Sequence, residues 1–185
     1  MATDLTKDAR QILIDLINEA NATTLTLDDI RFGGPSPIEN GNRNTGITIT
    51  ALPTSPYVGS RDLTYNRVDL SELPGERSTT FNVANHVTAF DMIPVLNDAY
   101  SINLSSDDIF DDPLPEIDPN DPDQKEPFVL RAKPGSLVYR NRITLTIRSN
   151  EISLAGLLVT DELSGFEYTG LFNIVDLNGF LYDGN

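Results

Sequence analysis

Cysteine is absent from the 185 residues, and histidine occurs once, as His86. Without cysteine, the chain has neither a disulfide framework nor a thiolate ligand for a metal ion. A single histidine excludes a two-histidine zinc site, including the HExxH arrangement of metalloproteases. The neighbours of His86, Asn85 and Val87, supply no nucleophile and no orienting acid, so we expect no catalytic role for His86.

Positive charge is also scarce, because 13 basic residues stand against 28 acidic ones and give a net charge of −15. Such a surface repels nucleic-acid phosphates and anionic membranes, so we expect neither as a partner. No stretch approaches the roughly 20 apolar residues that span a bilayer. Residues 1–7 lack the basic and apolar regions of a signal peptide. We therefore expect a soluble protein.

Motifs of the common enzyme classes are missing as well, namely GxSxG, the glycine-lysine phosphate loop and GxGxxG. Two pairs of carboxylates, Asp28-Asp29 and Asp107-Asp108, could in principle perform acid–base chemistry. Both stand where a helix pattern gives way to a strand pattern, and aspartate favours turns there because it binds its own backbone. We predict a protein that is not an enzyme and needs no cofactor.

A short phrase occurs twice in the chain, the second time 79 residues later (107 − 28). The first copy is Asn18-Glu19-Ala20, Leu25 and Asp28-Asp29-Ile30, and the second is Asn97-Asp98-Ala99, Leu104 and Asp107-Asp108-Ile109. Apolar residues at helical spacing precede both copies. The repeat predicts two related helix-turn-strand half-units, residues 1–80 and 81–185, which form one compact domain or two. The alternative is two unrelated helix-to-strand joins.

The hydrophobic pattern predicts an α+β, mainly β fold, with an antiparallel sheet or sandwich and two amphipathic helices. The first helix is expected over residues 4–21 with Thr3 or Asp4 as N-cap, and the second from an Asp91 N-cap to Tyr100. Alternation predicts strands at residues 45–52, 63–70, 79–83, 137–148, 151–159 and 166–175.

Residues 107–127 hold nine acidic residues, one lysine and five prolines. This composition predicts an exposed, extended, anionic loop, with Asp118, Asp121 and Asp123 as candidate interface residues. Calcium binding is the sharper hypothesis, because hard cations prefer carboxylates. The loop lacks the glycine and the closing glutamate of an EF-hand, which favours a spacer or a partner-binding arm.

Two further surfaces are candidate interfaces. Arg140, Arg142 and Arg148 fall on one face of the strand expected at 137–148, opposite an apolar face. They suit an acidic surface, which is the anionic loop of the same chain or of a neighbouring copy, or they are simply solvated. Phe180, Leu181 and Tyr182 form an apolar group that docks on its own domain or inserts into a neighbour.

The strand Ile47-Thr48-Ile49-Thr50-Ala51, the bridge Ser55-Pro56-Tyr57-Val58-Gly59-Ser60 and the segment Tyr65-Asn66-Arg67-Val68-Asp69-Leu70 occur in that order. Together with Ala99-Tyr100-Ser101-Ile102-Asn103-Leu104 they resemble virion structural proteins of large tailed bacteriophages. The resemblance implies a particle component without enzymatic activity, made in the host bacterial cytoplasm and located in the virion.

On this resemblance we expect a component of the tail, neck or baseplate, or a capsid decoration. It would act through a homo-oligomer and through contacts with other virion proteins. An alternative from a different class is a β-sandwich module that binds glycans or calcium, with the anionic loop as its ligand site.

Overall fold

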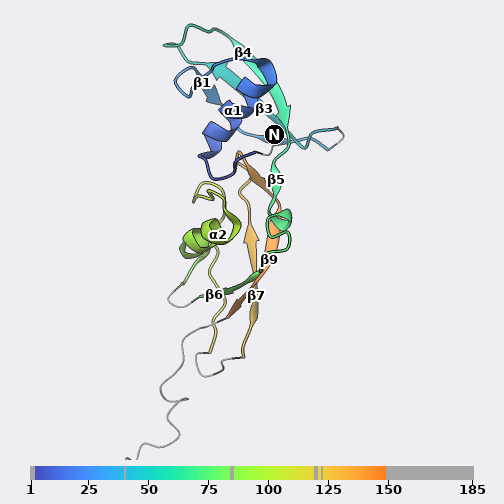
Figure 1. Ribbon diagram of the computed structural model, residues 1–185, viewed down its shortest axis with the longest axis vertical. Coiled ribbons are helices and arrows are strands. Elements are labelled where there is room, and N and C mark those ends of the chain that lie inside the picture. Colours follow the sequence, from blue (N-terminus) through green and yellow to red (C-terminus); the bar gives the residue numbers. More distant parts are fainter. Residues whose placement is uncertain (1–2, 40, 84–85, 119–120, 122, 149–185) are drawn as a thin grey trace, which may run out of the picture. The chain divides into compact units, whose positions relative to one another are not determined.

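The computed structural model describes residues 3–39, 41–83, 86–118, 121 and 123–148, all within the compact unit Met1–Glu151. This part of the chain is mainly β and carries two α-helices, as the α+β prediction requires (Figure 1). The strands predicted at 151–159 and 166–175 lie outside the described residues. The predicted boundary at residue 80 falls inside a paired strand, and the division into two domains stays a prediction.

Helix α1 (Ala9–Asn21) begins later than predicted, because Asp8 is its N-cap and not Thr3 or Asp4. The Asp8 carboxylate accepts a hydrogen bond from the Arg10 N–H at 2.9 Å, which satisfies one of the free donors at the helix start. Asp4 instead accepts the Thr6 N–H at 3.0 Å and closes a turn ahead of the helix.

Helix α2 (Ile93–Tyr100) is preceded by a 3-10 turn, η2 (Ala89–Met92), whose N-cap is Thr88. The expectation that Asp91 is the N-cap is therefore wrong. The Asp91 carboxylate reaches back to the N–H groups of Val87 and Thr88, at 2.8 and 2.9 Å, and closes a capping box. Pro94 lies in the first turn of α2, where its missing N–H costs no hydrogen bond.

The first sheet is built on β3 (Thr45–Ala51), as the alternation of residues 45–52 predicted. It pairs antiparallel with β1 (Ile30–Phe32) and β2 (Ser36–Pro37) along one edge and with β4 (Ser60–Tyr65) along the other. Ile47 and Ile49 point to the buried face of β3, because successive side chains of a strand alternate between faces.

The second sheet is built on β9 (Arg142–Arg148), which lies between β7 (Glu126–Arg131) and β6 (Thr80–Asn82). The β7 pair is antiparallel, and the β6 pair is parallel. A separate parallel pair joins β5 (Val68–Asp69) to β8 (Tyr139–Arg140). The two parallel pairs add to the predicted antiparallel pairing.

Two predicted strands are interrupted. The strand expected at 137–148 breaks at Asn141, which has φ 62° and so leaves the extended conformation between β8 and β9. The strand expected at 63–70 likewise divides into β4 and β5, and the 3-10 turn η1 (Leu70–Glu72) follows. A bulge within one strand was expected there, and the structure has a complete break.

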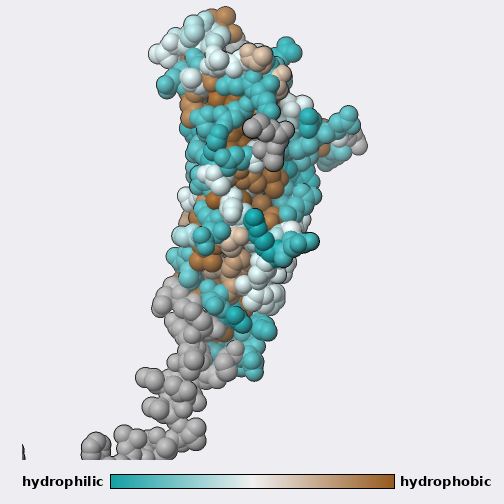
Figure 2. Space-filling view, viewed as in Figure 1, coloured by the Kyte–Doolittle hydropathy of each residue, from teal (hydrophilic) through white to brown (hydrophobic). Residues whose placement is uncertain are grey.

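Two hydrophobic clusters of unequal size hold these elements together. The smaller one consists of buried Ile14, Ile30 and Ile49, between α1 and the first sheet. The larger one contains the buried side chains of α2 and of the second sheet, and Ile12 of α1 joins it. Helix α1 therefore packs on both clusters. On the face shown in Figure 2, apolar residues (brown) appear between large hydrophilic areas (teal).

Candidate functional site

The repeated phrase folds the same way twice. The side-chain amide of Asn18 donates to the Leu25 carbonyl and accepts from the Leu25 N–H, both at 2.8 Å. Asn97 makes the same two bonds to Leu104, at 2.9 and 2.7 Å. Residues Ala22 and Ser101, with φ 52° and 54°, end the two helices in the left-handed conformation.

The aspartates of the phrase are structural, as the turn interpretation predicted. One oxygen of Asp29 accepts the N–H and hydroxyl of Thr26, each at 2.8 Å. These bonds, with the Thr26 hydroxyl as the main cause, lower the pKa of Asp29. Asp108 binds the N–H and hydroxyl of Ser105 in the same way, at 3.0 and 2.7 Å.

A second recurrence, which the sequence analysis missed, supplies the other partner of each aspartate. The sequence Ala51-Leu52-Pro53-Thr54-Ser55 returns as Ala132-Lys133-Pro134-Gly135-Ser136. The Ser55 hydroxyl donates to Asp29 at 3.1 Å, and the Ser136 hydroxyl to Asp108 at 2.6 Å. Its spacing differs by two residues from that of the first phrase, so a search at one constant offset passes over it.

The strands complete the equivalence. Ile30 pairs with Ala51, and Ile109 pairs with Ala132, in antiparallel bridges. Strand β7 therefore takes the place of β3, and β9 takes the place of β4. We name residues 9–65 the first half-unit, residues 89–148 the second half-unit, and residues 66–83 the connector.

The connector packs on the second half-unit. Val68 pairs with Tyr139, and the Phe81 backbone pairs with Ile147 of β9. Leu70 is fully buried and Phe81 is 7% exposed, both within the larger hydrophobic cluster. The Phe81 ring meets the Tyr100 ring edge-on, with centroids 5.8 Å apart. The chain that leaves one half-unit thus completes the core of the next.

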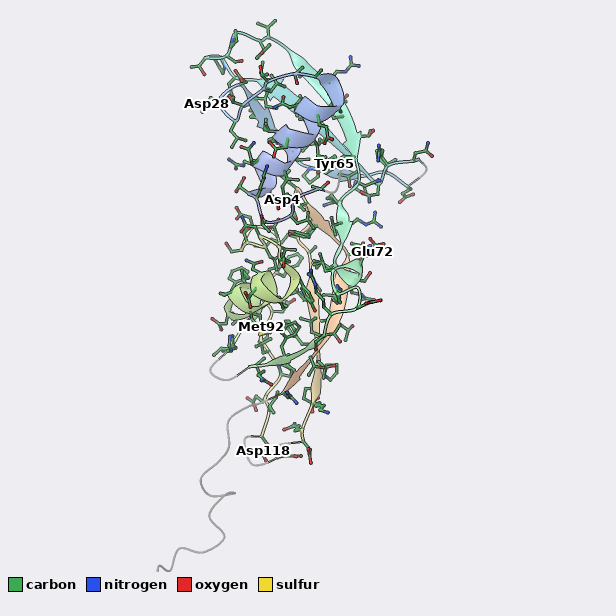
Figure 3. All side chains as sticks on the ribbon, viewed as in Figure 1. Asp4, Asp28, Tyr65, Glu72, Met92 and Asp118 are labelled. Atoms are coloured by element: carbon green, nitrogen blue, oxygen red, sulfur yellow. The ribbon has the colours of Figure 1, made fainter. Side chains whose placement is uncertain are left out.

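Polar contacts fix the junction between the half-units. The Arg67 guanidinium donates to the carbonyls of Pro134 and Ser136, each at 3.0 Å. The Tyr65 hydroxyl, at the end of β4 in Figure 3, donates to the Leu137 carbonyl at 2.7 Å. Burial raises the pKa of Tyr65 to about 12, so this hydroxyl stays a donor at neutral pH.

The three arginines do not form one strip. Arg140 lies on β8, with its Nε 3.8 Å from the Asp69 carboxylate, whereas Arg142 and Arg148 are exposed on β9. The break at Asn141 separates them, which corrects the expected continuous face. Arg148 donates from Nε to the Asn82 side chain at 2.7 Å. Their role as interface residues stays a prediction. Phe180, Leu181 and Tyr182 lie outside the described residues.

The anionic loop is shorter than predicted. Asp108 is buried, and Asp112 receives two hydrogen bonds from Arg131, at 2.6 and 2.9 Å. These bonds lower the pKa of Asp112. Only the later part matches the expectation of exposure. There the Asp118 N–H donates to Gln124 at 2.6 Å, and the Asp121 carboxylate accepts the Asp123 N–H at 3.0 Å (Figure 3 labels Asp118).

The widest cleft, about 1120 Å³, runs between the start of α1, β1 and the loops of residues 103–110 and 133–137. Its charged residues are bound within the chain. Lys133 donates from Nζ to the Ser106 carbonyl at 2.7 Å, and Asp108 is held by Ser105 and Ser136. No histidine or cysteine lines it. The cleft therefore lacks the nucleophile and base that covalent catalysis requires.

Two searches were confined to the part of the chain that the structure describes. There, no group of three or more histidine, aspartate or glutamate side chains is arranged to hold a metal ion. No helix of that part is long and apolar enough to cross a membrane. The calcium hypothesis consequently has no preformed site in the described residues of the anionic loop.

Comparison with known proteins gives one match. The model of a family of unknown function, DUF7941, matches residues 2–172. No curated protein and no solved structure matches the chain. Since the family match covers both half-units and the connector, the chain belongs to the family of unknown function DUF7941.

Proposed function

We propose that this protein is a non-enzymatic structural component of a tailed-bacteriophage particle. It is a part of the tail, neck or baseplate, or a decoration of the capsid, and it acts by binding copies of itself and other virion proteins. The sequence resemblance to virion structural proteins supports this proposal, and so does the absence of catalytic motifs from the chain.

The observation that carries the proposal is the way in which consecutive half-units interlock. The connector leaves the first half-unit and buries Leu70 and Phe81 in the second. Repeated units that complete one another's cores suit an extended assembly, because each added unit covers the apolar surface of the last. The carboxylates best placed for chemistry, Asp29 and Asp108, are instead committed to turns.

Mass spectrometry of purified particles tests the proposal. We expect peptides of this protein to stay with the particles through successive gradient and salt-wash steps, in constant ratio to the major capsid protein. Host cytoplasmic proteins serve as the control and should fall with each step. If this protein falls with them, it is not a particle component and the proposal fails.

A further inference from the structure

The two half-units are equivalent in backbone but differ in how their outer strand is covered. Ile143, Leu145 and Ile147 of β9 are buried, and the connector strand β6 pairs with β9. In β4, the equivalent of β9, Leu63 and Tyr65 are only half-buried. Among the described strands β4 pairs with β3 alone. The first half-unit therefore keeps an edge that its counterpart has covered.

A groove lies at this edge. Its volume is about 110 Å³, and it is mainly apolar, lined by Leu13, Leu16, Ile17, Ala20, Asn21, Phe32, Ile47, Leu63, Thr64 and Tyr65. Tyr65 and Asn21 are the counterparts of Ile147 and Tyr100. Those two residues are the strand partner and the ring partner of Phe81. The groove thus lies at the position that Phe81 fills in the second half-unit.

The loop beside the groove is also uncovered. Tyr57 is 46% exposed and Val58 is 95% exposed, although both are large apolar residues. They correspond to Tyr139 and Arg140, the two residues of β8 that pair with β5 of the connector. A nearly bare valine at an otherwise paired position points to a strand supplied from elsewhere.

The sequence after β9 repeats the pattern of the connector. The connector carries Val68, Leu70 and Leu73, followed by Phe81, and the later segment carries Ile152, Leu154 and Leu157, followed by Phe166. In each set the first three residues have the same spacing. The later segment follows β9 as the connector follows β4. A connector reaches the next half-unit along the chain, and the half-unit after β9 belongs to another copy.

We propose that residues 152–168 of one copy cover the first half-unit of a second copy. Ile152 and Ser153 pair with Tyr57 and Val58, and Leu154 and Phe166 take the positions of Leu70 and Phe81. The proposal deepens the proposed function, on which it rests only for the place of the assembly. Arg67 has no arginine counterpart in this segment, so strand pairing and apolar burial hold the contact.

The contact is head-to-tail, because one copy uses its later segment and the other its first half-unit. Such a heterologous contact leaves a free surface at each end of the pair, so association continues until a ring closes or a filament grows. Assembly therefore increases with protein concentration beyond a dimer.

Sedimentation velocity of the pure full-length protein over a range of concentrations tests this. We expect the wild type to form oligomers. Val58→Asp should weaken association at least about tenfold, because a carboxylate would be buried without a partner. Val87→Asp is the matched control, since Val87 is 68% exposed and lies outside the proposed contact. It should associate as the wild type does. Thermal unfolding checks that each variant is folded.

A mixing experiment identifies the two surfaces. Val58→Asp keeps the donating segment and loses the receiving surface, whereas Leu154→Asp does the opposite. Each alone should be monomeric, and an equimolar mixture should form a dimer that grows no further. A wild type that stays monomeric, or a mixture that stays monomeric, overturns the proposal.

The absence of cysteine permits a second readout of the same contact. Val58→Cys and Ser153→Cys, each made alone and mixed under oxidation, should yield one disulfide-linked heterodimer. Homodimers alone would contradict the pairing. Detection in particles and self-association of pure protein are separate measurements, so this inference and the proposed function can fail independently.

Discussion

Replacement of Phe81 tests the central role of the connector. The Phe81 side chain is 7% exposed and packs edge-on against Tyr100 within the larger hydrophobic cluster. Truncation of a buried phenylalanine to alanine costs about 3–5 kcal/mol, as lost burial plus the cavity that remains. A domain of this kind has a total stability of about 5–15 kcal/mol, so Phe81→Ala should remove a large part of it.

Urea unfolding followed by circular dichroism measures the free energy of unfolding of Phe81→Ala and of a matched variant, Phe110→Ala. Phe110 is 37% exposed and lies under the Arg131 guanidinium, 4.9 Å from its ring centroid. Its loss should cost about 1 kcal/mol or less, since a partly exposed cation–π contact contributes only that much. Equal losses in the two variants would refute the conclusion that the connector closes the core of the second half-unit.

Three further predictions concern the repeated turns and a charge pair. Asn18→Ala and Asn97→Ala should each lower the free energy of unfolding by about 1–3 kcal/mol, because each removes two side-chain hydrogen bonds. Asn21→Ala, which removes one exposed bond, is the control, and an effect as large as theirs would contradict the shared role of Asn18 and Asn97. Ser136→Ala should cost about 1–3 kcal/mol, since it leaves the buried Asp108 carboxylate without one donor; Ser55→Ala, at a half-buried site, should cost less in the same urea assay. The pKa of Asp112 is lowered by Arg131, so its contribution to stability is present above the unfolded pKa of about 3.9 and is lost as pH falls through the folded pKa. Unfolding midpoints at pH 7 and pH 3 should therefore differ less in Asp112→Asn than in the wild type, and a difference as large as that of the wild type would refute the contribution; the exposed Asp98→Asn is the control.

The elements that the sequence predicted well depend on contacts between near neighbours in the chain. The turn after each helix is one example, because Asn18 bonds Leu25 only seven residues away. The strand β3 and the buried face of β9 are others, because alternation within one strand decides which side chains are buried. The N-caps were misplaced by a few residues, since several aspartates and threonines near each helix start could serve.

The tertiary structure alone decided which strands meet. The connector pairs in parallel with β8 and β9, more than sixty residues away, and nothing in its own alternation names those partners. The pairing of Asp112 with Arg131, which shortens the anionic loop, and the break at Asn141 were equally hidden. The sequence determined the local turns and the faces of its strands, because those depend on periodicity and short-range hydrogen bonds. The pairing between half-units was left to the tertiary structure, because it depends on which distant apolar surfaces remain to be covered once each half-unit has formed.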